Sequence, residues 1–150
     1  MSLKTQIDAD IKDAMRAKDK ESLRALRAIK SLILLEETKE GKTGELSEEE
    51  EIQLLSKAAK QRRESARIYH EQGRAELAKN EEDEIAIIEK YLPKQLSEDE
   101  LSAKLKEIIQ QVGASSPKDM GKVMGSASKA LAGQADGKAI ASMVKTLLAN

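Results

Sequence analysis

Apolar residues recur at every third or fourth position along the first part of the chain, which places their side chains on one face of an α-helix. Leu3 and Ile7 begin the first such run. Gly41 and Gly44 interrupt the pattern after the second run, and Pro93 ends the fourth because proline lacks the amide that a helix interior needs. The pattern predicts helices over residues 3–18, 20–38, 47–72 and 74–91.

Three further helices are expected after Pro93, each bounded by residues that favour helix ends. A serine followed three residues later by a glutamate has the spacing of a capping box, in which each side chain bonds the backbone amide of the other. Proline suits the first helical turn, and glycine commonly follows the last one. These signals predict helices over residues 97–113, 116–131 and 136–150. Capping boxes of Ser47 with Glu50 and of Ser97 with Glu100 open the third and the fifth helix of the chain.

We therefore predict an all-α fold in two parts. An N-terminal four-helix antiparallel domain spans residues 1–92, residues 93–95 form a linker, and a three-helix C-terminal domain spans residues 96–150. Composition agrees, because Leu, Ile, Ala, Val and Met must form the core, while the aromatic residues that strands favour are nearly absent. A domain of roughly 55 residues buries little apolar surface, so we expect it to pack against its neighbour or a partner.

Composition also excludes several classes of site. The sequence holds no Cys and a single His, His70, so a disulfide framework, a thiol nucleophile and a His- or Cys-rich metal site are not expected. No apolar run approaches the roughly 18 residues of a membrane span, and the first residues lack the apolar core of a signal peptide. We expect a cytoplasmic protein that binds no metal, no cofactor and no membrane.

The formal net charge of −1 hides a difference between the two parts. Residues 93–150 contain eight lysines and six acidic residues, whereas residues 1–92 contain 18 basic and 21 acidic residues. This lysine excess is small beside that of a basic nucleic-acid-binding arm, and we do not expect DNA as a partner.

The segment DMGKVMG, residues 119–125, has the most informative pattern. At ~100° per residue, Lys118, Lys122 and Lys129 fall within about 40° of one another, opposite the apolar residues, and Gly121 and Gly125 lie beside them. Glycine in a helix costs up to about 1 kcal/mol relative to alanine. Either the glycines admit a closely packed neighbouring helix, or a bare surface flanked by lysines lets a large anion such as a phosphate backbone approach, or their spacing is a matter of chance.

The segment ADGK, residues 135–138, opens the last predicted helix. Asp136 suits a helix cap, and the amides of Gly137, Lys138 and Ala139 form the positive end of the helix, where an anion can sit. A plain helix cap explains the same residues. Neither a P-loop nor a G-x-G-x-x-G motif occurs, so nucleotide binding is not predicted.

A second basic stripe follows the third predicted helix at steps of three or four residues. It is either a cationic surface or a solvated face whose charges pair with nearby carboxylates, as Arg67 would with Glu71. Arg62 falls on the apolar face instead, where a guanidinium needs a carboxylate, and Glu81 and Glu84 are the candidates. The stripe consists of Lys60, Arg63, Arg67, His70 and Arg74.

Little in the sequence favours catalysis. The acidic runs at residues 48–51 and 81–84 are typical of helix starts and solvated faces, rather than of isolated catalytic carboxylates. No serine lies in a nucleophile turn, and no second His is present to form a catalytic triad. The residues alone indicate a helical, non-catalytic interaction protein.

Four segments in order across nearly the whole chain resemble the YqeY-like family, whose members share the GatB/YqeY motif. They are KQRRESARIYHEQGRAELA, EIAIIEKYLPKQLSEDEL, GASSPKDMGKVMG and ADGK. The resemblance implies an N-terminal four-helix part and a C-terminal three-helix part. It also makes the C-terminal part similar to the tail domain of the B subunit of the tRNA-dependent amidotransferase.

That amidotransferase converts Glu-tRNA(Gln) or Asp-tRNA(Asn) to the amide form, with glutamine as nitrogen donor and ATP. Its tail helps to hold the tRNA while other domains do the chemistry, and a related domain is appended to some glutaminyl-tRNA synthetases. The resemblance implies a tRNA-contact surface, to which the spacing above adds Lys129. The positions that carry over are Lys118, Gly121, Lys122, Gly125, Gly137 and Lys138.

The expected function is a non-catalytic adaptor with tRNA, and an amidotransferase or aminoacyl-tRNA synthetase, as partners. The alternative is a protein–protein module that docks on an aminoacyl-tRNA enzyme without touching RNA. The chain is too short to hold the catalytic cradle of the B subunit, so we do not expect carbon–nitrogen ligase activity from it alone. Tyr69 and Tyr91 are the only aromatic residues, so we expect recognition by shape and phosphate contacts rather than base stacking.

Overall fold

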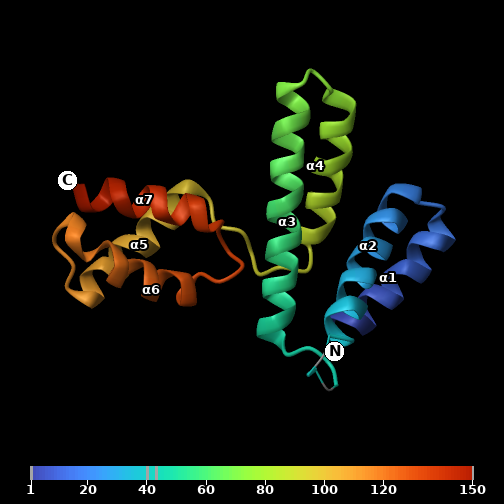
Figure 1. Ribbon diagram of the computed structural model, residues 1–150, viewed down its shortest axis with the longest axis horizontal. Coiled ribbons are helices and arrows are strands. Elements are labelled where there is room, and N and C mark those ends of the chain that lie inside the picture. The colour runs from blue at the N-terminus through green and yellow to red at the C-terminus, as the bar shows by residue number, and fades with distance from the viewer. Residues whose placement is uncertain (1, 40, 43, 150) are drawn as a thin grey trace. The chain divides into compact units, whose positions relative to one another are not determined.

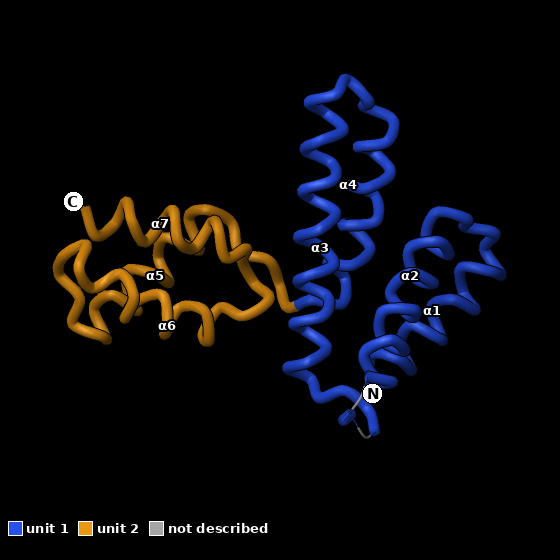
Figure 2. The backbone as a smooth tube through the Cα atoms, in the orientation of Figure 1, with its two compact units in different colours: residues 1–92 blue, residues 93–150 orange. Residues whose placement is uncertain are grey.

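The protein is all-helical in the computed structural model, which describes residues 2–39, 41–42 and 44–149. Within these ranges the chain forms seven α-helices and one short 3-10 turn, with no β-strand (Figure 1). The predicted all-α class is therefore confirmed. The chain divides into two compact units, residues 1–92 and 93–150, which hold four and three α-helices and so fit the four-plus-three arrangement (Figure 2).

The N-terminal unit consists of two helical hairpins. The first is α1 with α2, the second is α3 with α4, and α2 packs against both helices of the second hairpin (Figure 1). Within the described part of the chain, no helix is long and apolar enough to cross a membrane. The bounds of the four helices are Leu3–Ala17, Lys20–Glu37, Glu48–Glu71 and Ala75–Glu89.

Side chains at the helix starts satisfy backbone amides that have no partner within the helix. The hydroxyl of Ser47 accepts a hydrogen bond from the amide of Glu50 at 3.2 Å, and the carboxylate of Glu50 accepts one from the amide of Ser47 at 2.8 Å. The predicted capping box is therefore present. At the start of α2, Asp19 accepts a bond of 3.1 Å from the amide of Ser22.

The core of the N-terminal unit is built from isoleucine, leucine and alanine. Ala58, Ala59 and Ala66 of α3 are buried, as is Ala78 of α4. These small side chains let the two helices of the second hairpin lie close together over their length. The largest fully buried side chains of the unit are Ile7, Ile29, Ile33, Leu55 and Ile88.

The C-terminal unit packs three helices around an aliphatic core. Leu105, Val123 and Val144 are completely buried and come from different helices. A 3-10 turn, η1, precedes the second of these helices and packs against both α6 and α7. The elements are α5 (Glu98–Val112), η1 (Pro117–Asp119), α6 (Met120–Ala130) and α7 (Gly137–Ala149).

The structure corrects the prediction of one continuous helix from residue 116. The carboxylate of Asp119 accepts hydrogen bonds from the amides of Ser115 at 2.9 Å and Ser116 at 3.3 Å. The amide of Asp119 in turn donates to the carbonyl of Ser116 at 2.9 Å. These bonds across three and four residues hold a tight turn, and the α-helix begins only at Met120.

The residues just before α5 form hydrogen bonds with the loop between α6 and α7. The side-chain amide of Gln95 donates to the carbonyl of Gly133 at 2.5 Å, and the backbone amide of Leu96 donates to the carbonyl of Gln134 at 2.9 Å. This loop leads directly into α7, so the two bonds help to fix where that helix begins.

Candidate functional site

One side of α6 is buried and the other is open to solvent. Val123 and Ala127 are completely buried in the core of the C-terminal unit. Gly121, Lys122, Gly125, Ser128 and Lys129 are all exposed. We call these five exposed residues, together with Lys118 in η1, the α6 face.

The glycines of the α6 face have nothing packed against them. A methyl group added at Gly121 or Gly125 would meet no heavy atom of the described residues within 4 Å, apart from the helix's own adjoining backbone. Among the described residues, no helix of the C-terminal unit therefore packs closely on either glycine. A glycine within a helix is unfavourable by up to about 1 kcal/mol relative to alanine, and the described contacts within the C-terminal unit do not explain why two are present.

The lysines of the α6 face are exposed and have no carboxylate partner in the portion that the structure describes. Lys122 and Lys129 are seven residues apart in one α-helix, so they project to nearly the same side, as predicted. Lys118 lies in η1, and a 3-10 turn rotates by a different angle per residue, so the predicted angle of about 40° does not apply to it.

Asp119 is the acidic residue next to the α6 face. The hydrogen bonds from the amides of Ser115 and Ser116, aided by the charge of Lys122, hold the pKa of Asp119 below its ordinary value of 3.8. The carboxylate is therefore ionised at neutral pH and engaged by the turn that carries Lys118. It reduces the positive charge of the face without occupying a lysine in an ion pair.

Gly137 and Lys138 lie in the first turn of α7, and both are exposed. The carbonyl of Asp136 accepts a hydrogen bond of 3.0 Å from the amide of Ile140, so Asp136 directly precedes the helix. A methyl group at Gly137 would also meet nothing within 4 Å among the described residues. These positions belong to a different helix from the α6 face and stay a separate part of the candidate surface.

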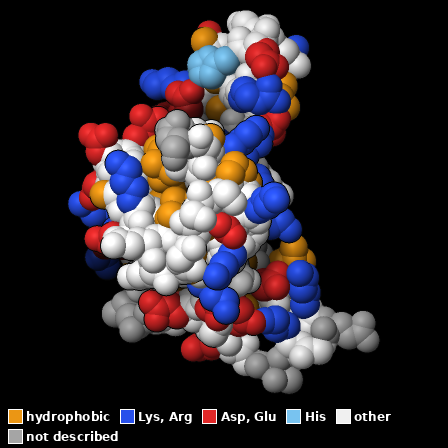
Figure 3. Space-filling model, turned by 90° about the vertical axis from the view of Figure 1, so that its left-hand side faces the viewer, with side chains coloured by type: hydrophobic (Ala, Val, Ile, Leu, Met, Phe, Trp, Pro, Cys, Tyr) orange, Lys and Arg blue, Asp and Glu red, His pale blue; other side chains and the backbone are white. Residues whose placement is uncertain are grey.

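The second basic stripe is largely paired with carboxylates. Arg63 contacts Glu89 of α4 at 3.3 Å, and His70 contacts Glu82 of α4 at 2.7 Å. Arg67 pairs with two glutamates of its own helix, one of them Glu71 at 2.5 Å. These pairs support the solvated face over the cationic surface, and on the view in Figure 3 acidic and basic side chains are likewise interspersed. Two members of the stripe, Lys60 and Arg74, are exposed and form no ion pair among the described residues.

Arg62 forms the ion pair that its place on the apolar face predicts. Its Nε lies 2.8 Å from a carboxylate oxygen of Glu84, and the two side chains are only 17% and 16% exposed. Arg24 of α2 reaches the other oxygen of the same carboxylate at 3.2 Å. Glu84 therefore joins α2, α3 and α4, and the choice between Glu81 and Glu84 is settled in favour of Glu84.

One polar contact has no local signal in the sequence. The hydroxyl of Tyr91, just after α4, donates a short hydrogen bond to the carboxylate of Asp10 in α1. Desolvation by burial, together with this bond, raises the pKa of Tyr91. The two residues lie far apart in the sequence, so only the fold brings them together.

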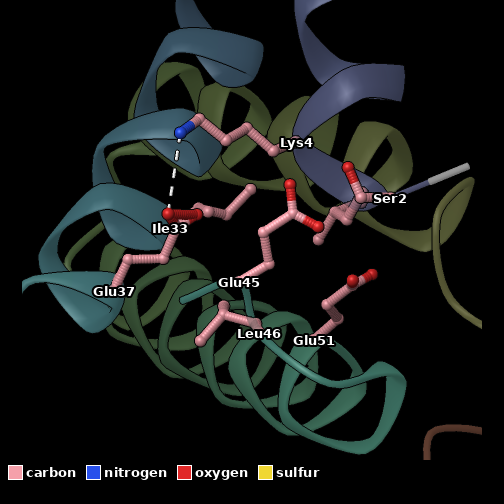
Figure 4. A pocket seen from close by; sticks show the side chains of 8 residues that line it. Ser2, Lys4, Ile33, Glu37, Glu45, Leu46 and Glu51 are labelled. Atoms are coloured by element: carbon pink, nitrogen blue, oxygen red, sulfur yellow. Dashed lines mark ion pairs between the residues drawn. The ribbon is translucent and has the colours of Figure 1, made fainter. Parts of the chain in front are cut away.

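A small pocket of about 10 Å³ lies in the N-terminal unit, among the start of α1, the end of α2 and the start of α3 (Figure 4). Lys4 pairs there with Glu37 at 3.6 Å, and Glu45 and Glu51 also line the pocket. Among the residues that the structure describes, no three His, Cys, Asp or Glu side chains are grouped so as to hold a metal ion. The α6 face therefore stays the main candidate site.

A comparison with protein families adds one finding. The family model described as "Yqey-like protein" matches residues 4–148, which is nearly the whole chain. No curated protein matches the chain.

Proposed function

The chain belongs to the YqeY-like family, and from this premise we propose that it is a non-catalytic adaptor that binds tRNA in the cytoplasm. The contact surface is the α6 face, with Gly137 and Lys138 at the start of α7 as further contacts. The observation that supports this most is the pair of uncovered glycines, Gly121 and Gly125, beside lysines that have no carboxylate partner among the described residues.

The physical argument concerns how closely a phosphate backbone can approach a helix. Without a side chain at Gly121 and Gly125, a large anion can reach the surface of the helix itself. The ammonium groups of Lys122 and Lys129 beside it then neutralise phosphates and release their counterions, which is the main source of affinity for nucleic acids. A small patch of three or four lysines gives moderate affinity that depends strongly on salt.

The test is a charge reversal on the face with a matched reversal elsewhere. In the variant Lys118→Glu, Lys122→Glu, Lys129→Glu, tRNA binding should be lost at low salt while the helix content measured by circular dichroism stays unchanged. The control is Lys20→Glu, Lys57→Glu, Lys79→Glu, which changes the net charge equally at three exposed helical positions of the N-terminal unit. Equal loss of binding in both variants would show that net charge, and not this face, governs binding.

The link to the amidotransferase is part of the same proposal. The adaptor would present tRNA to an enzyme of the amidotransferase or aminoacyl-tRNA synthetase class, and the partner would supply the carbon–nitrogen ligase chemistry. Purified chain with glutamine, ATP and Glu-tRNA(Gln) should therefore form no amide. Turnover in that assay would contradict the proposal of a non-catalytic adaptor.

The uncovered glycines also support a second candidate, in which a helix of an aminoacyl-tRNA enzyme packs closely on Gly121 and Gly125. This docking module would make no direct contact with RNA. Capture of such an enzyme by the tagged chain should then survive nuclease treatment. Capture that requires intact RNA would favour the tRNA adaptor.

A further inference from the structure

We propose that the outer end of the α3–α4 hairpin, residues 64–82, packs against the same surface of a second copy of this chain. We call these residues the hairpin end. They belong to the N-terminal unit, outside the surface proposed for tRNA. Two features of this unit support the dimer: the α1–α2 hairpin covers only part of one side of α3 and α4, and the hairpin end is opposite in charge to the α1–α2 turn.

One side of α4 is covered by the α1–α2 hairpin only in its second half. Leu77 and Glu84 are seven residues apart in this helix, so their side chains project to nearly the same side. Glu84 meets Arg24 of α2 at 3.2 Å, and Tyr91, just after the helix, bonds Asp10 of α1. Leu77, about 10 Å along the helix from Glu84, is 38% exposed. The first half of this side therefore lacks such a cover among the described residues of the N-terminal unit.

The same holds for α3. Leu54 and Ile68 are fourteen residues apart in this helix and project within about 40° of each other. Leu54 packs against the core of the N-terminal unit, whereas Ile68 is 39% exposed. Figure 1 shows why: the turn that joins α3 to α4 reaches beyond the turn that joins α1 to α2. The hairpin end thus carries one large exposed apolar side chain on each helix, next to the surface on which α2 packs.

A second copy of the chain supplies a matching apolar surface. In a two-fold dimer the same patch lies on both sides of the interface, so the apolar pair of one copy, Ile68 and Leu77, meets the same pair of the other. The α1–α2 hairpin of each copy already occupies the adjoining part of this side, so the two hairpin ends meet without a clash when they point in opposite directions. The four helices then form a short antiparallel bundle, which extends the packing of α2 on α3 and α4.

The charges of the N-terminal unit favour this antiparallel arrangement and oppose a nucleic acid at the same surface. The hairpin end contains five acidic and three basic residues. Residues 16–20, in and beside the α1–α2 turn, contain three basic residues and one acid, Asp19, which caps α2. Lys18 and Lys20 are exposed and form no ion pair among the described residues. In the dimer each hairpin end approaches these lysines of the other copy, whereas its excess of carboxylates repels a polyanion.

The first test is the mass of the full chain in solution. Sedimentation equilibrium at low salt, from about 1 µM to about 500 µM, should show a monomer–dimer equilibrium with a dissociation constant on the order of 100 µM, because so small a contact lies at the weak end of protein interfaces. Added salt should weaken the dimer, since it screens exposed charges. A chain that stays monomeric at every concentration would overturn the proposal.

A pair of matched variants tests the apolar contact. Ile68→Glu, Leu77→Glu should weaken the dimer at least about tenfold, because unpaired carboxylates of both copies then face one another in the interface. Leu34→Glu, Leu35→Glu adds the same charge in α2, at positions that are 39% and 65% exposed, and should leave the dimer unchanged within about twofold. Both variants should keep the helix content of the parent chain. Equal weakening by both, or no weakening by the first, would overturn the proposal.

Charge reversal tests the antiparallel arrangement. The variant Lys18→Glu, Lys20→Glu and the separate variant Glu71→Lys, Glu76→Lys change exposed residues of the turn and of the hairpin end. Each variant alone places like charges at both contacts of a two-fold dimer, so it should self-associate at least about tenfold more weakly than the parent chain. An equal mixture of the two restores opposite charges at both contacts and should dimerise more tightly than either variant alone.

The control for this mixture is Glu49→Lys, Glu107→Lys, which carries the same net charge as the hairpin-end variant at two exposed positions elsewhere. Mixed with Lys18→Glu, Lys20→Glu, it should not restore the dimer. Equal association in both mixtures would show that net charge alone draws the chains together, and it would overturn the proposed arrangement.

Discussion

At the scale of single residues, glycine plays two different parts in the C-terminal unit. Gly113 ends α5 with a φ of +70°, a left-handed conformation that side chains other than glycine rarely adopt. Gly125 lies within α6 in open space and has no such conformational requirement. The fold explains the first glycine, whereas no described contact within the C-terminal unit explains the second.

The same substitution, glycine to alanine, should change the free energy of unfolding in opposite directions at these two positions. Gly113→Ala should lower the free energy of unfolding by about 1 kcal/mol, because alanine is strained at positive φ. Gly125→Ala should raise it by about 0.5–1 kcal/mol and weaken tRNA binding. Both are measured by urea unfolding and by tRNA titration. A Gly125→Ala variant that is less stable than the parent, or that binds tRNA more tightly, would contradict the account of the α6 face.

The residue scale also shows how far the sequence could predict the candidate site. The exposure of Lys122 and Lys129 follows from their place opposite Val123 and Ala127, so helical periodicity was sufficient. The environment of the glycines was not predictable, because two glycines four residues apart in a helix are equally compatible with a packed neighbour and with an open surface. Only the structure shows that no described residue of the C-terminal unit packs against them.

At the scale of elements, the helix starts were the best predicted feature of the fold. Ser47 with Glu50 and Ser97 with Glu100 form the capping boxes that their spacing indicates. Such signals are local, so they can be recognised without knowing the fold. The 3-10 turn at η1 was missed because Ser116 and Pro117 suit the start of either kind of helix, and the bonds of Asp119 decide between them.

The carboxylates that cap these elements make the free energy of unfolding depend on pH. Hydrogen bonds from nearby amides and hydroxyls hold the pKa values of Asp19 and Glu100 below their ordinary values of 3.8 and 4.5, and the pKa of Asp119 is lowered likewise. The folded state therefore binds fewer protons than the unfolded state in this range. Their stabilisation is complete above the ordinary values and is lost as the pH falls through the lower values of the folded chain.

The melting temperature should consequently be level between pH 7 and about pH 5 and fall below about pH 4. Asp119→Asn should melt earlier than the parent chain at pH 7, and the difference should shrink as the pH falls below 3.8. Glu107→Gln, which removes one exposed carboxylate in the middle of α5, is the control for the loss of charge. Circular dichroism melts across this pH range check the prediction, and a difference that widens with acid would refute it.

At the scale of the whole molecule, long-range pairs were the least predictable part of the fold. The place of Arg62 on an apolar helix face predicted an ion pair, and in the structure its partner is Glu84. Arg24, which shares that carboxylate, and the bond of Tyr91 to Asp10 gave no signal in the sequence. Periodicity gives the helices, but it does not give the order in which helices pack.

The two units also differ in how many of their cationic side chains form ion pairs. In the N-terminal unit, Arg63 and Arg67 of the basic stripe are paired with carboxylates, so these two arginines are less available to a polyanion. In the C-terminal unit, no lysine of residues 117–149 has an ion-pair partner within the described ranges. The central claim is therefore that the C-terminal unit holds tRNA by its lysines.

The most direct test of that claim is the affinity of the purified chain for total tRNA over a series of salt concentrations. Four phosphate contacts, from Lys118, Lys122, Lys129 and Lys138, predict that log K falls against log salt with a slope of about −3 to −4. The variant with Lys118, Lys122 and Lys129 changed to Glu should lose this binding. A chain that binds no tRNA at low salt, or binds it with no dependence on salt, would contradict the account and direct the search to a protein partner.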